Sequence, residues 1–359
     1  MNQYAIALIP GDGVGKEVVP AGLQVLDAAG KLTDAFQLKT TAFDWGCEYY
    51  LKHGRMMDGD ALATLASFDA IYLGAVGYPG VPDHVSLWGL LLPIRQGFDQ
   101  YINLRPIKLF EGIQGPLRGK GPQDIDFVVV RENSEGEYAG HGGRSHRGRP
   151  QEVATQTTIF TRTGVERVMR YSFELARQRG VKPDQPLVSA TKSNAQQYVS
   201  VLWDEVAREI GQQFPDVPWR SVLVDALAAL MILHPERLDV VVASNLFGDI
   251  LTDLGGALQG SLGLPASANL NPERRYPSMF EPVHGSAPDI AGRGIANPFA
   301  TIWAGAMMLD HLGEKQAANL VMGALERVIA QARVRTPDLD GTNTTDEVAK
   351  AVISQLVKR

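Results

Sequence analysis

The sequence predicts an α/β protein of about two domains. Short apolar runs rich in Val, Ile and Ala alternate along the chain with longer segments of helical periodicity, which is the pattern of an α/β fold. The length of 359 residues, at a prior of roughly 150 residues per domain, indicates two domains.

The predicted strands and helices follow from the period of the apolar residues. Strands are expected at 4–10 (YAIALIP), 69–77 (DAIYLGAVG), 125–132 (IDFVVVRE), 186–191 (PLVSAT) and 238–245 (LDVVVASN). A helix is expected over 164–180, because Val165, Val168, Met169, Phe173 and Leu175 fall near one helical face. Residues 315–334 predict a long helix that closes the fold. The segments 111–124 and 136–152, rich in Gly and in basic or polar residues, predict connections between elements.

The composition excludes several functional classes. A net charge of -6 argues against a nucleic-acid-binding protein, which needs a basic face. No apolar run reaches the ~18 residues of a membrane helix, and the first residues lack the basic region of a secretion signal. The single cysteine, Cys47, excludes an internal disulfide and a zinc site built from cysteines. We therefore expect a cytoplasmic protein that binds neither nucleic acid nor membrane.

Familiar cofactor and hydrolase motifs are absent. GDGVGKE, residues 11–17, matches neither GxGxxG nor GxxxxGK[ST], so its spacing favours a tight strand-to-helix turn with Asp12 near the helix N-terminus. There is no GxSxG elbow and no HExxH pair.

Two aspartates in SNLFGDILTDLGGAL, residues 244–258, predict a metal site. On a helix, Asp249 and Asp253 would lie about 40° apart around the axis, so both carboxylates would point the same way and repel unless a cation joins them. Such oxygen ligands suit Mg²⁺ or Mn²⁺. The alternative is that Asp249 caps the helix and Asp253 lies on a solvated face. Because the flanking residues are small and apolar and offer no evident solvated face, we favour the metal.

Other charged residues stand beside apolar segments and predict an anionic ligand. Arg95 lies in LLLPIRQGF, Arg105 lies in NLRP, Arg131 directly follows FVVV, and Lys192 follows LVSAT, all in apolar or turn contexts. Each alone could be a residue whose stem is buried and whose charge reaches water. Together with a divalent metal, three arginines indicate a small ligand with several carboxylates, because Arg binds carboxylates through two parallel hydrogen bonds.

Seven motifs extend over essentially the whole chain: IPGDGVGKEV, NLRP, VVVRENSEGEYAG, TKSN, VDA, ASNLFGDILTDLGG and EPVHGSAPDIAGRGIANP. In their order and spacing they resemble the metal-dependent β-decarboxylating hydroxyacid dehydrogenases, which include isopropylmalate, isocitrate, and tartrate or D-malate dehydrogenases. The segment DHVSLWGLLLPIRQGFDQYINLRP looks most like the tartrate/D-malate branch.

The resemblance implies a fold and an assembly. The fold would be the two-domain isopropylmalate/isocitrate dehydrogenase-like fold, a mixed sheet with helices and not a Rossmann fold. A cofactor-side domain would comprise 1–103 and 257–359, and a central domain 104–256 would carry the dimer interface. An arm at about 137–160 would clasp a second subunit, so that a homodimer with shared active sites forms.

The resemblance also implies the roles of the charged residues. Mg²⁺ or Mn²⁺ would be held by Asp249 and Asp253 with Asp225 of the partner subunit, and a need for a monovalent cation such as K⁺ is left open. The substrate, a small dicarboxylate hydroxyacid, would bind the metal through its hydroxyl and adjacent carboxylate. The partner's Lys192 would act as the base for the hydroxyl proton, with Asp225 beside it, and Tyr138 would protonate the enol carbon. Arg95, Arg105 and Arg131 would hold the β-carboxylate.

The cofactor expected from the resemblance is NAD. It would lie against the loop at 284–290 and against Asn297; the loop residues expected to contact it are His284, Gly285, Ser286, Ala287, Asp289 and Ile290. An aspartate at 289 would accept hydrogen bonds from the adenosine ribose, whereas NADP-dependent relatives carry Lys and Tyr at this and the next position. A carboxylate there would repel a 2'-phosphate.

The helix before Arg95 is expected to select the substrate. Isocitrate enzymes place Ser and Asn where this chain has Gly89 and Leu91, so a γ-carboxylate would face apolar groups. The indole of Trp88 is expected to fill the space of an isopropyl group, which predicts D-malate and tartrates as substrates. If Trp88 instead packs into the core, 3-isopropylmalate dehydrogenase of leucine biosynthesis is the alternative.

One alternative belongs to another functional class. Some members of the family are non-catalytic regulatory subunits that lack part of the Arg, Tyr, Lys and Asp set. The set is complete here, which favours an enzyme.

Overall fold

The computed structural model describes residues 1–357, which fold into two compact units. Within the described residues, unit 1 comprises 1–100, 108–122 and 256–357, and unit 2 comprises Tyr101–Ile107 and Gln123–Gly255. The segment 108–122 thus belongs with the chain termini. Each unit is described by itself.

Unit 1 contains five strands and most of the helices. The strands are β1 (Asn2–Gly11), β2 (Phe36–Ala42), β3 (Ala70–Ala75), β11 (Ala266–Leu270) and β12 (Ser278–Pro282). The helices are α1 (Gly15–Thr33), α2 (Cys47–His53), α3 (Ala61–Leu65), α4 (Asp83–Ser86), α5 (Leu92–Gly97), α10 (Phe299–Leu312), α11 (Lys315–Gln331) and α12 (Thr345–Ser354). A π-helical turn, Leu87–Leu91, joins α4 to α5, and a 3-10 turn covers Pro337–Leu339.

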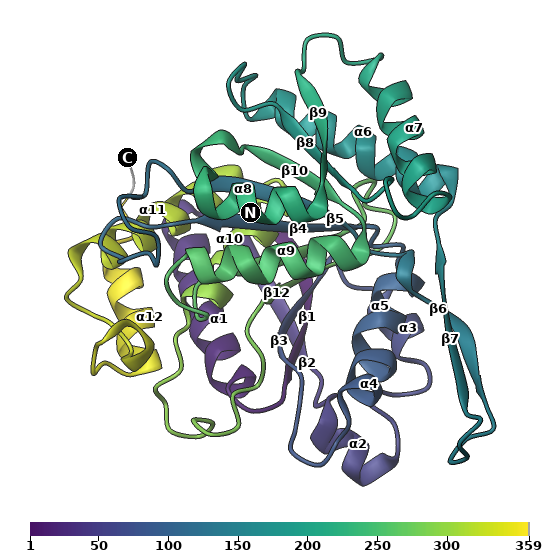
Figure 1. Ribbon diagram of the computed structural model, residues 1–359. Coiled ribbons are helices and arrows are strands. Elements are labelled where there is room, and N and C mark those ends of the chain that lie inside the picture. The colour runs from purple at the N-terminus through teal and green to yellow at the C-terminus, as the bar shows by residue number, and fades with distance from the viewer. Residues whose placement is uncertain (358–359) are drawn as a thin grey trace. The chain divides into compact units, whose positions relative to one another are not determined.

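The inner strands of the unit 1 sheet are buried on both faces, whereas the edge strand β2 is mostly exposed. Its strands run in the order β2-β1-β3-β12-β11, with parallel pairs except for the antiparallel pair of β11 and β12. Alternate residues of a strand point to opposite faces: Ile71 and Leu73 join the apolar core against α2, α3 and α5, whereas Tyr72 donates a hydrogen bond to the Thr301 carbonyl of α10. Helices α1, α10, α11 and α12 pack on one another on that second side (Figure 1).

Unit 2 contains the remaining elements. The strands are β4 (Ile102–Lys108), β5 (Asp126–Glu132), β6 (Gly136–Ser145), β7 (Val153–Ile159), β8 (Leu187–Thr191), β9 (Trp219–Leu223) and β10 (Val240–Ala243). The helices are α6 (Arg162–Gln178), α7 (Val199–Gly211), α8 (Val224–Leu233) and α9 (Asn245–Leu258), and a 3-10 turn covers Pro235–Arg237.

The sheet of unit 2 has the order β4-β5-β10-β8-β9, and the pairs from β5 to β9 are parallel. Helix α6 packs on β5 and β10, and α8 packs on β8 and β9. Helix α9 approaches β4 closely because Gly255 has no side chain: a Cβ there would lie 2.1 Å from Cδ1 of Ile107. This glycine therefore sets the position of the helix that carries Asp249 and Asp253.

The segment 136–159 forms a two-stranded antiparallel ribbon, β6 with β7, whose residues are mostly exposed (Figure 1). The loop expected at 136–152 is therefore largely strand. A ribbon of two strands is at best marginally stable by itself in water.

Most of the predicted elements are confirmed. All five expected strands are present, as β1, β3, β5, β8 and β10, and the helix expected over 164–180 is α6. The expectation that residues 315–334 close the fold is wrong: α11 ends at Gln331, and α12 follows it. Helix α12 was missed, although Thr344 and Glu347 form a capping box at its start.

Asp12 lies in a tight turn between β1 and α1, as expected, and its side chain has a further role. Its carboxylate is fully buried and accepts hydrogen bonds from the backbone N–H groups of Cys47, Glu48 and Gly77, at 2.9 to 3.2 Å. It therefore binds the N-terminus of α2 and not that of α1. Three backbone donors compensate a buried carboxylate, which the sequence spacing could not indicate.

Within residues 1–357, no helix combines the length and the apolar character that crossing a membrane requires.

Candidate active site

The parallel strands of unit 2 bring the predicted residues to one edge of its sheet. Arg131 lies near the end of β5, opposite Ala243 of β10, and α9 begins at Asn245 directly after β10. Lys192 follows β8, and Asp225 lies in the first turn of α8, directly after β9. The carboxyl ends of parallel strands are the usual place for a ligand site in α/β sheets.

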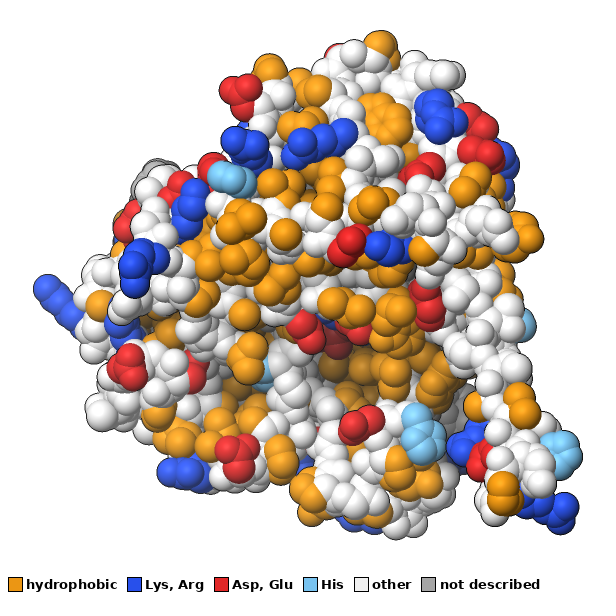
Figure 2. Space-filling model, in the orientation of Figure 1, with side chains coloured by type: hydrophobic (Ala, Val, Ile, Leu, Met, Phe, Trp, Pro, Cys, Tyr) orange, Lys and Arg blue, Asp and Glu red, His pale blue; other side chains and the backbone are white. Residues whose placement is uncertain are grey.

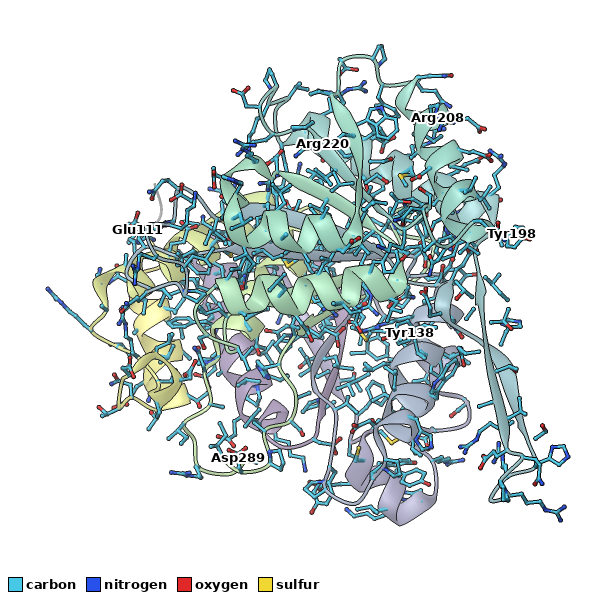
Figure 3. The ribbon with its side chains drawn as sticks, viewed as in Figure 1. Glu111, Tyr138, Tyr198, Arg208, Arg220 and Asp289 are labelled. Carbon is cyan, nitrogen blue, oxygen red and sulfur yellow. The ribbon has the colours of Figure 1, made fainter. Side chains whose placement is uncertain are left out.

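Three predicted residues converge on Asp249, in the second turn of α9. The Arg131 guanidinium donates a hydrogen bond from Nη1 to Oδ1, and the Tyr138 hydroxyl donates to Oδ2 at 2.8 Å. Nη2 of Arg105 lies 3.7 Å from Oδ1. Tyr138 thus lies beside α9 (Figure 3), with its ring 5.4 Å from the Arg131 guanidinium. The result is a compact group of two cations, one carboxylate and one phenol.

Both arginines of this group are buried and are held by neutral side chains. Nε of Arg105 donates to Oδ1 of Asn103 at 2.7 Å, and its Nη1 donates to Oγ1 of Thr252 at 2.6 Å. Nε and Nη2 of Arg131 both donate to Oδ1 of Asn245, at 3.0 and 2.7 Å. Both buried guanidinium groups face the same Asp249 carboxylate, whose single charge balances only one of them, so the site suits a further anionic ligand.

Sequence reasoning missed Asn103, Thr252 and Asn245. A signal for each was present: Asn103 belongs to NLRP with Arg105, and the other two flank Asp249 in the α9 motif. Side chains three or four positions apart on a helix share a face, which could have directed attention to both.

Asp253 follows Asp249 by one helical turn, as expected, but the expectation of no solvated face is wrong for the single chain. Asp253 is exposed, Ile250 beside it is 59% exposed, and the Asp249 side chain is 35% exposed. Asp249 is not a cap either, because α9 begins at Asn245.

Within the described part of one chain, no three acidic, His or Cys side chains are grouped to hold a metal ion. The oxygens of Asp249 and Asp253 fit the ligand preference of Mg²⁺ or Mn²⁺, but Asp225 does not join them in a single chain. Asp225 instead pairs with Lys192, at 2.7 Å, and its side chain is 65% exposed. The hydrogen bond from Lys192 holds the pKa of Asp225 below its usual value. Both groups of a Lys–Asp pair are thus presented at the surface of unit 2.

Apolar side chains are exposed on the same two helices. Ile232 and Leu233 of α8 and Ile250 of α9 are more than one third exposed, and hydrophobic atoms gather over α8 and α9 in Figure 2. Helix α8 is apolar over nearly its whole length, with Asp225 as its one charged residue. Exposed apolar patches of this kind mark interaction surfaces.

Arg95 and the segment before it belong to unit 1. Arg95 is buried on α5, and its Nη2 donates to Oε1 of Glu281 on β12 at 2.9 Å. Asn269 Nδ2 donates to the same oxygen at 2.7 Å. Arg95, which was predicted to bind a substrate carboxylate, is therefore engaged in a buried ion pair with Glu281 within unit 1.

The π-helical turn before Arg95 determines how Trp88 is presented. Pro93 has no N–H, and a ring there opposes a regular helix; the N–H of Leu92 bonds the carbonyl of Leu87, five residues back. Trp88 is 42% exposed, so it does not pack into the core, and Leu91 is partly buried. Gly89 faces Met56: a Cβ there would lie 2.5 Å from its Cγ.

The predicted cofactor loop is supported by the turn after β1. The backbone N–H of Val14 donates to the Ser286 carbonyl at 2.9 Å, and Gly13, at φ +53°, allows this approach. Ile290 packs against Val14 and Val18, whereas Asp289 lies exposed on the loop (Figure 3). Gly285 has open space where a side chain would be, and Ala287 adopts a positive φ.

His284 and Asn297 lie near an aspartate that sequence reasoning missed. Burial lowers the pKa of His284, and its Nε2 is buried without a hydrogen-bond partner among the described residues. Asn297 donates to Oδ2 of Asp338 at 2.9 Å, and Asp338 also acts electrostatically on His284. An unpartnered buried nitrogen beside an open glycine fits a polar ligand such as an adenine nucleotide. Only the fold brings Asp338 to this loop.

Comparisons with known proteins define the class of this protein. The family model described as isocitrate/isopropylmalate dehydrogenase matches residues 5–352. In fold, the chain resembles the crystal structure of isocitrate dehydrogenase from Methylococcus capsulatus, with a TM-score of 0.87, 36% identity and full coverage of both chains. The chain therefore belongs to the isocitrate/isopropylmalate dehydrogenase family and has its mixed α/β fold.

Two curated relatives narrow the comparison. The chain is 58% identical to a probable tartrate dehydrogenase/decarboxylase of Agrobacterium vitis over 356 residues, 99% of this chain and 98% of the relative. It is 53% identical to the D-malate dehydrogenase (decarboxylating) of Escherichia coli K12 over 365 aligned positions, 100% of both chains. The protein is a decarboxylating dehydrogenase, an oxidoreductase that acts on a CH–OH group.

Proposed function

We propose that the protein oxidises and decarboxylates D-malate to pyruvate and CO2 with NAD and a divalent metal, and that it also acts on tartrates. The observation that carries the proposal is the convergence of Arg131, Arg105 and Tyr138 on Asp249. Its cations suit a dicarboxylate, its carboxylate suits a metal, and its phenol can transfer a proton. The names of the two curated relatives support this choice of substrate.

The proposed metal site consists of Asp249 and Asp253 of one chain and Asp225 of the partner subunit. Mg²⁺ or Mn²⁺ bound there would polarise the substrate hydroxyl and the later keto oxygen. The pairing of Asp225 with Lys192 at the surface supports the proposal, because both groups are available to a second chain.

A homodimer would complete the site. The exposed apolar residues of α8 and α9 lie on the helices that carry Asp225, Asp249 and Asp253, so an isologous contact there would bring the two sets of ligands together. The ribbon β6–β7 needs a covering partner for stability and supports the same assembly.

In the proposed reaction, residues of the two subunits move two protons. Lys192 of the partner subunit takes the proton of the C2 hydroxyl as the C2–H bond breaks. Arg105 and Arg131 hold the β-carboxylate until the C3–C4 bond breaks and CO2 leaves, and Tyr138 then delivers its hydroxyl proton to C3. The 2.8 Å bond from Tyr138 to Asp249 orients the phenol beside both arginines.

NAD is the proposed hydride acceptor, and the exposed Asp289 supports its choice over NADP. The loop 284–290, with Asn297, is the proposed contact surface for the adenosine. An aspartate facing a 2'-phosphate costs about 1 kcal/mol at 4 Å even in water, and more in a pocket.

The exposed indole of Trp88 supports a small substituent on the substrate. Leu91 beside it offers no polar group for a γ-carboxylate. Arg95 remains a proposed ligand of the substrate, which would have to compete with Glu281 for its guanidinium.

One panel of initial rates tests the proposal. With NAD and Mn²⁺, kcat/KM should rank D-malate first, then L-tartrate and meso-tartrate, with isopropylmalate weaker and isocitrate negligible. A higher kcat/KM for isopropylmalate than for D-malate would make the protein an isopropylmalate dehydrogenase instead. No turnover of any of the five by the purified protein would indicate a regulatory subunit.

A further inference from the structure

Asn245, the first residue of α9, binds the guanidinium of Arg131 and is 1% exposed. Its Oδ1 accepts from Nε and Nη2 of Arg131, at 3.0 and 2.7 Å. We infer that Asn245 is a positioning residue, which orients Arg131 for the substrate carboxylate without neutralising its charge. This inference rests on the proposed role of Arg131.

Arg131 is held along its whole length. Gly248 leaves room for the stem, since a Cβ there would lie 2.6 Å from Cγ of Arg131. Asn245 holds the edge of the guanidinium formed by Nε and Nη2, and Asp249 accepts from Nη1. A free arginine loses rotamer entropy when it is immobilised. A guanidinium that is already oriented does not incur this cost again when the substrate binds.

The other half of the Asn245 amide fixes its direction. Nδ2 donates to the backbone carbonyl of Glu135 at 3.0 Å. The next residue, Gly136, has φ +75°, and a Cβ there would lie 3.2 Å from Cβ of Asn245. The Glu135 carboxylate in turn accepts from Thr161 N, at 2.8 Å, and from the Thr161 hydroxyl, where the chain leaves β7 at the same base of the ribbon. The amide therefore joins Arg131 to the base of the ribbon that carries Tyr138.

Only an amide can accept from the Arg131 guanidinium and at the same time donate to the Glu135 carbonyl. Aspartate has the same shape and would accept from Arg131, but it has no donor for the Glu135 carbonyl. It would also place a second carboxylate one turn before Asp249, where like charges repel, and it would neutralise the guanidinium that a substrate carboxylate needs. If Asn245 had a structural role alone, aspartate would weaken ligand binding only as far as it lowers Tm.

The test compares Asn245→Asp, Asn245→Ala and the control Ser244→Ala at saturating Mn²⁺. The Ser244 hydroxyl is buried next to Asn245 and has no hydrogen-bond partner in the structure of residues 1–357, so its removal changes the same helix end without loss of a bond. The measurements are Tm, KM for NAD, kcat and KM for the best substrate of the unmodified protein, and calorimetric affinity for malonate, a dicarboxylate that needs no turnover.

For Asn245→Asp we expect KM for the hydroxyacid and Kd for malonate to rise about tenfold to a hundredfold. This is the effect of losing one charge-assisted hydrogen bond between Arg131 and the carboxylate of the ligand. Its KM for NAD should not change, and its Tm should fall no further than that of Asn245→Ala, because the new carboxylate still accepts from Arg131. Asn245→Ala should weaken malonate binding as well, with a lower Tm, and Ser244→Ala should match the unmodified protein.

Unchanged malonate affinity in Asn245→Asp would overturn the inference, as would losses in both Asn245 variants that follow Tm alone. If the unmodified protein prefers another hydroxyacid to D-malate, the proposed substrate is wrong, whereas the malonate comparison still decides the role of Asn245.

Discussion

Asp249→Asn is the change that examines the candidate site most directly. The substitution keeps the shape of the side chain and one oxygen acceptor, but it removes the negative charge between Arg131, Arg105 and Tyr138. It also removes an anionic ligand of the proposed metal. The two effects can be measured separately. Loss of the charge changes the stability of the metal-free protein, whereas loss of the ligand changes only the response to metal.

The effect on stability can be estimated from the contacts. A hydrogen bond to a charged group contributes about 1.5–3 kcal/mol, but Asp249 is about one third exposed, so solvent screening reduces this contribution to roughly 1 kcal/mol. For a chain of this size, that free energy corresponds to a decrease in Tm of about 2–4 °C or less. The metal-free variant should therefore remain folded.

The effect on turnover should be much larger. Loss of one of three anionic metal ligands should lower kcat/KM at least about a hundredfold, which corresponds to ~2.7 kcal/mol. The Mn²⁺ concentration for half-maximal activity should rise as well. The assay is a titration of cofactor reduction against Mn²⁺, accompanied by thermal unfolding with and without the metal.

Asp346→Asn serves as the matched control. It removes the same charge from an exposed helical aspartate in unit 1, which pairs with Lys350 at 2.6 Å, and such a pair contributes little. Its activity and Mn²⁺ dependence should equal those of the unmodified protein. Full turnover of Asp249→Asn after exhaustive chelation would refute the metal assignment.

Three further predictions follow from the site and its surroundings. Lys192→Ala should abolish most of the cofactor reduction, whereas Tyr138→Phe should mainly slow release of CO2 or protonation of the enol; near-normal cofactor reduction by Lys192→Ala would exclude it as the base. The unmodified protein should prefer NAD to NADP at least about tenfold, or ~1.4 kcal/mol, and Asp289→Ala should narrow this ratio; comparable kcat/KM with both cofactors before the change would contradict the role of Asp289. Ile250→Glu should convert dimers to inactive monomers in sedimentation at micromolar concentration, because burial of an isoleucine contributes about 1.5–3 kcal/mol per chain; an active monomer would disprove the shared site.

Much of the fold could be predicted from local patterns. The segments that form β1, β3, β5, β8 and β10 are short and apolar, and α6 has its apolar residues at helical spacing. The local sequence pattern is therefore sufficient to predict these elements. The ribbon β6–β7 could not be recognised as strands, because it is rich in Gly and polar residues and has no apolar alternation. The two segments form strands because β6 and β7 pair with each other, and this pairing is a property of the tertiary structure.

The candidate site, like the fold, has features that the sequence determines and features that only the tertiary structure decides. The sequence by itself determined which residue types are available and the helical spacing of Asp249 and Asp253, since four positions on a helix always share a face. Only the tertiary structure decided that Tyr138 and Arg131, more than a hundred residues earlier, meet Asp249, and that Asn245 orients the arginine. The reason is that parallel strands place their carboxyl ends at one edge whatever their separation in the chain. Helical spacing is a local property of the backbone, whereas the convergence of strand ends depends on the order in which the strands pair.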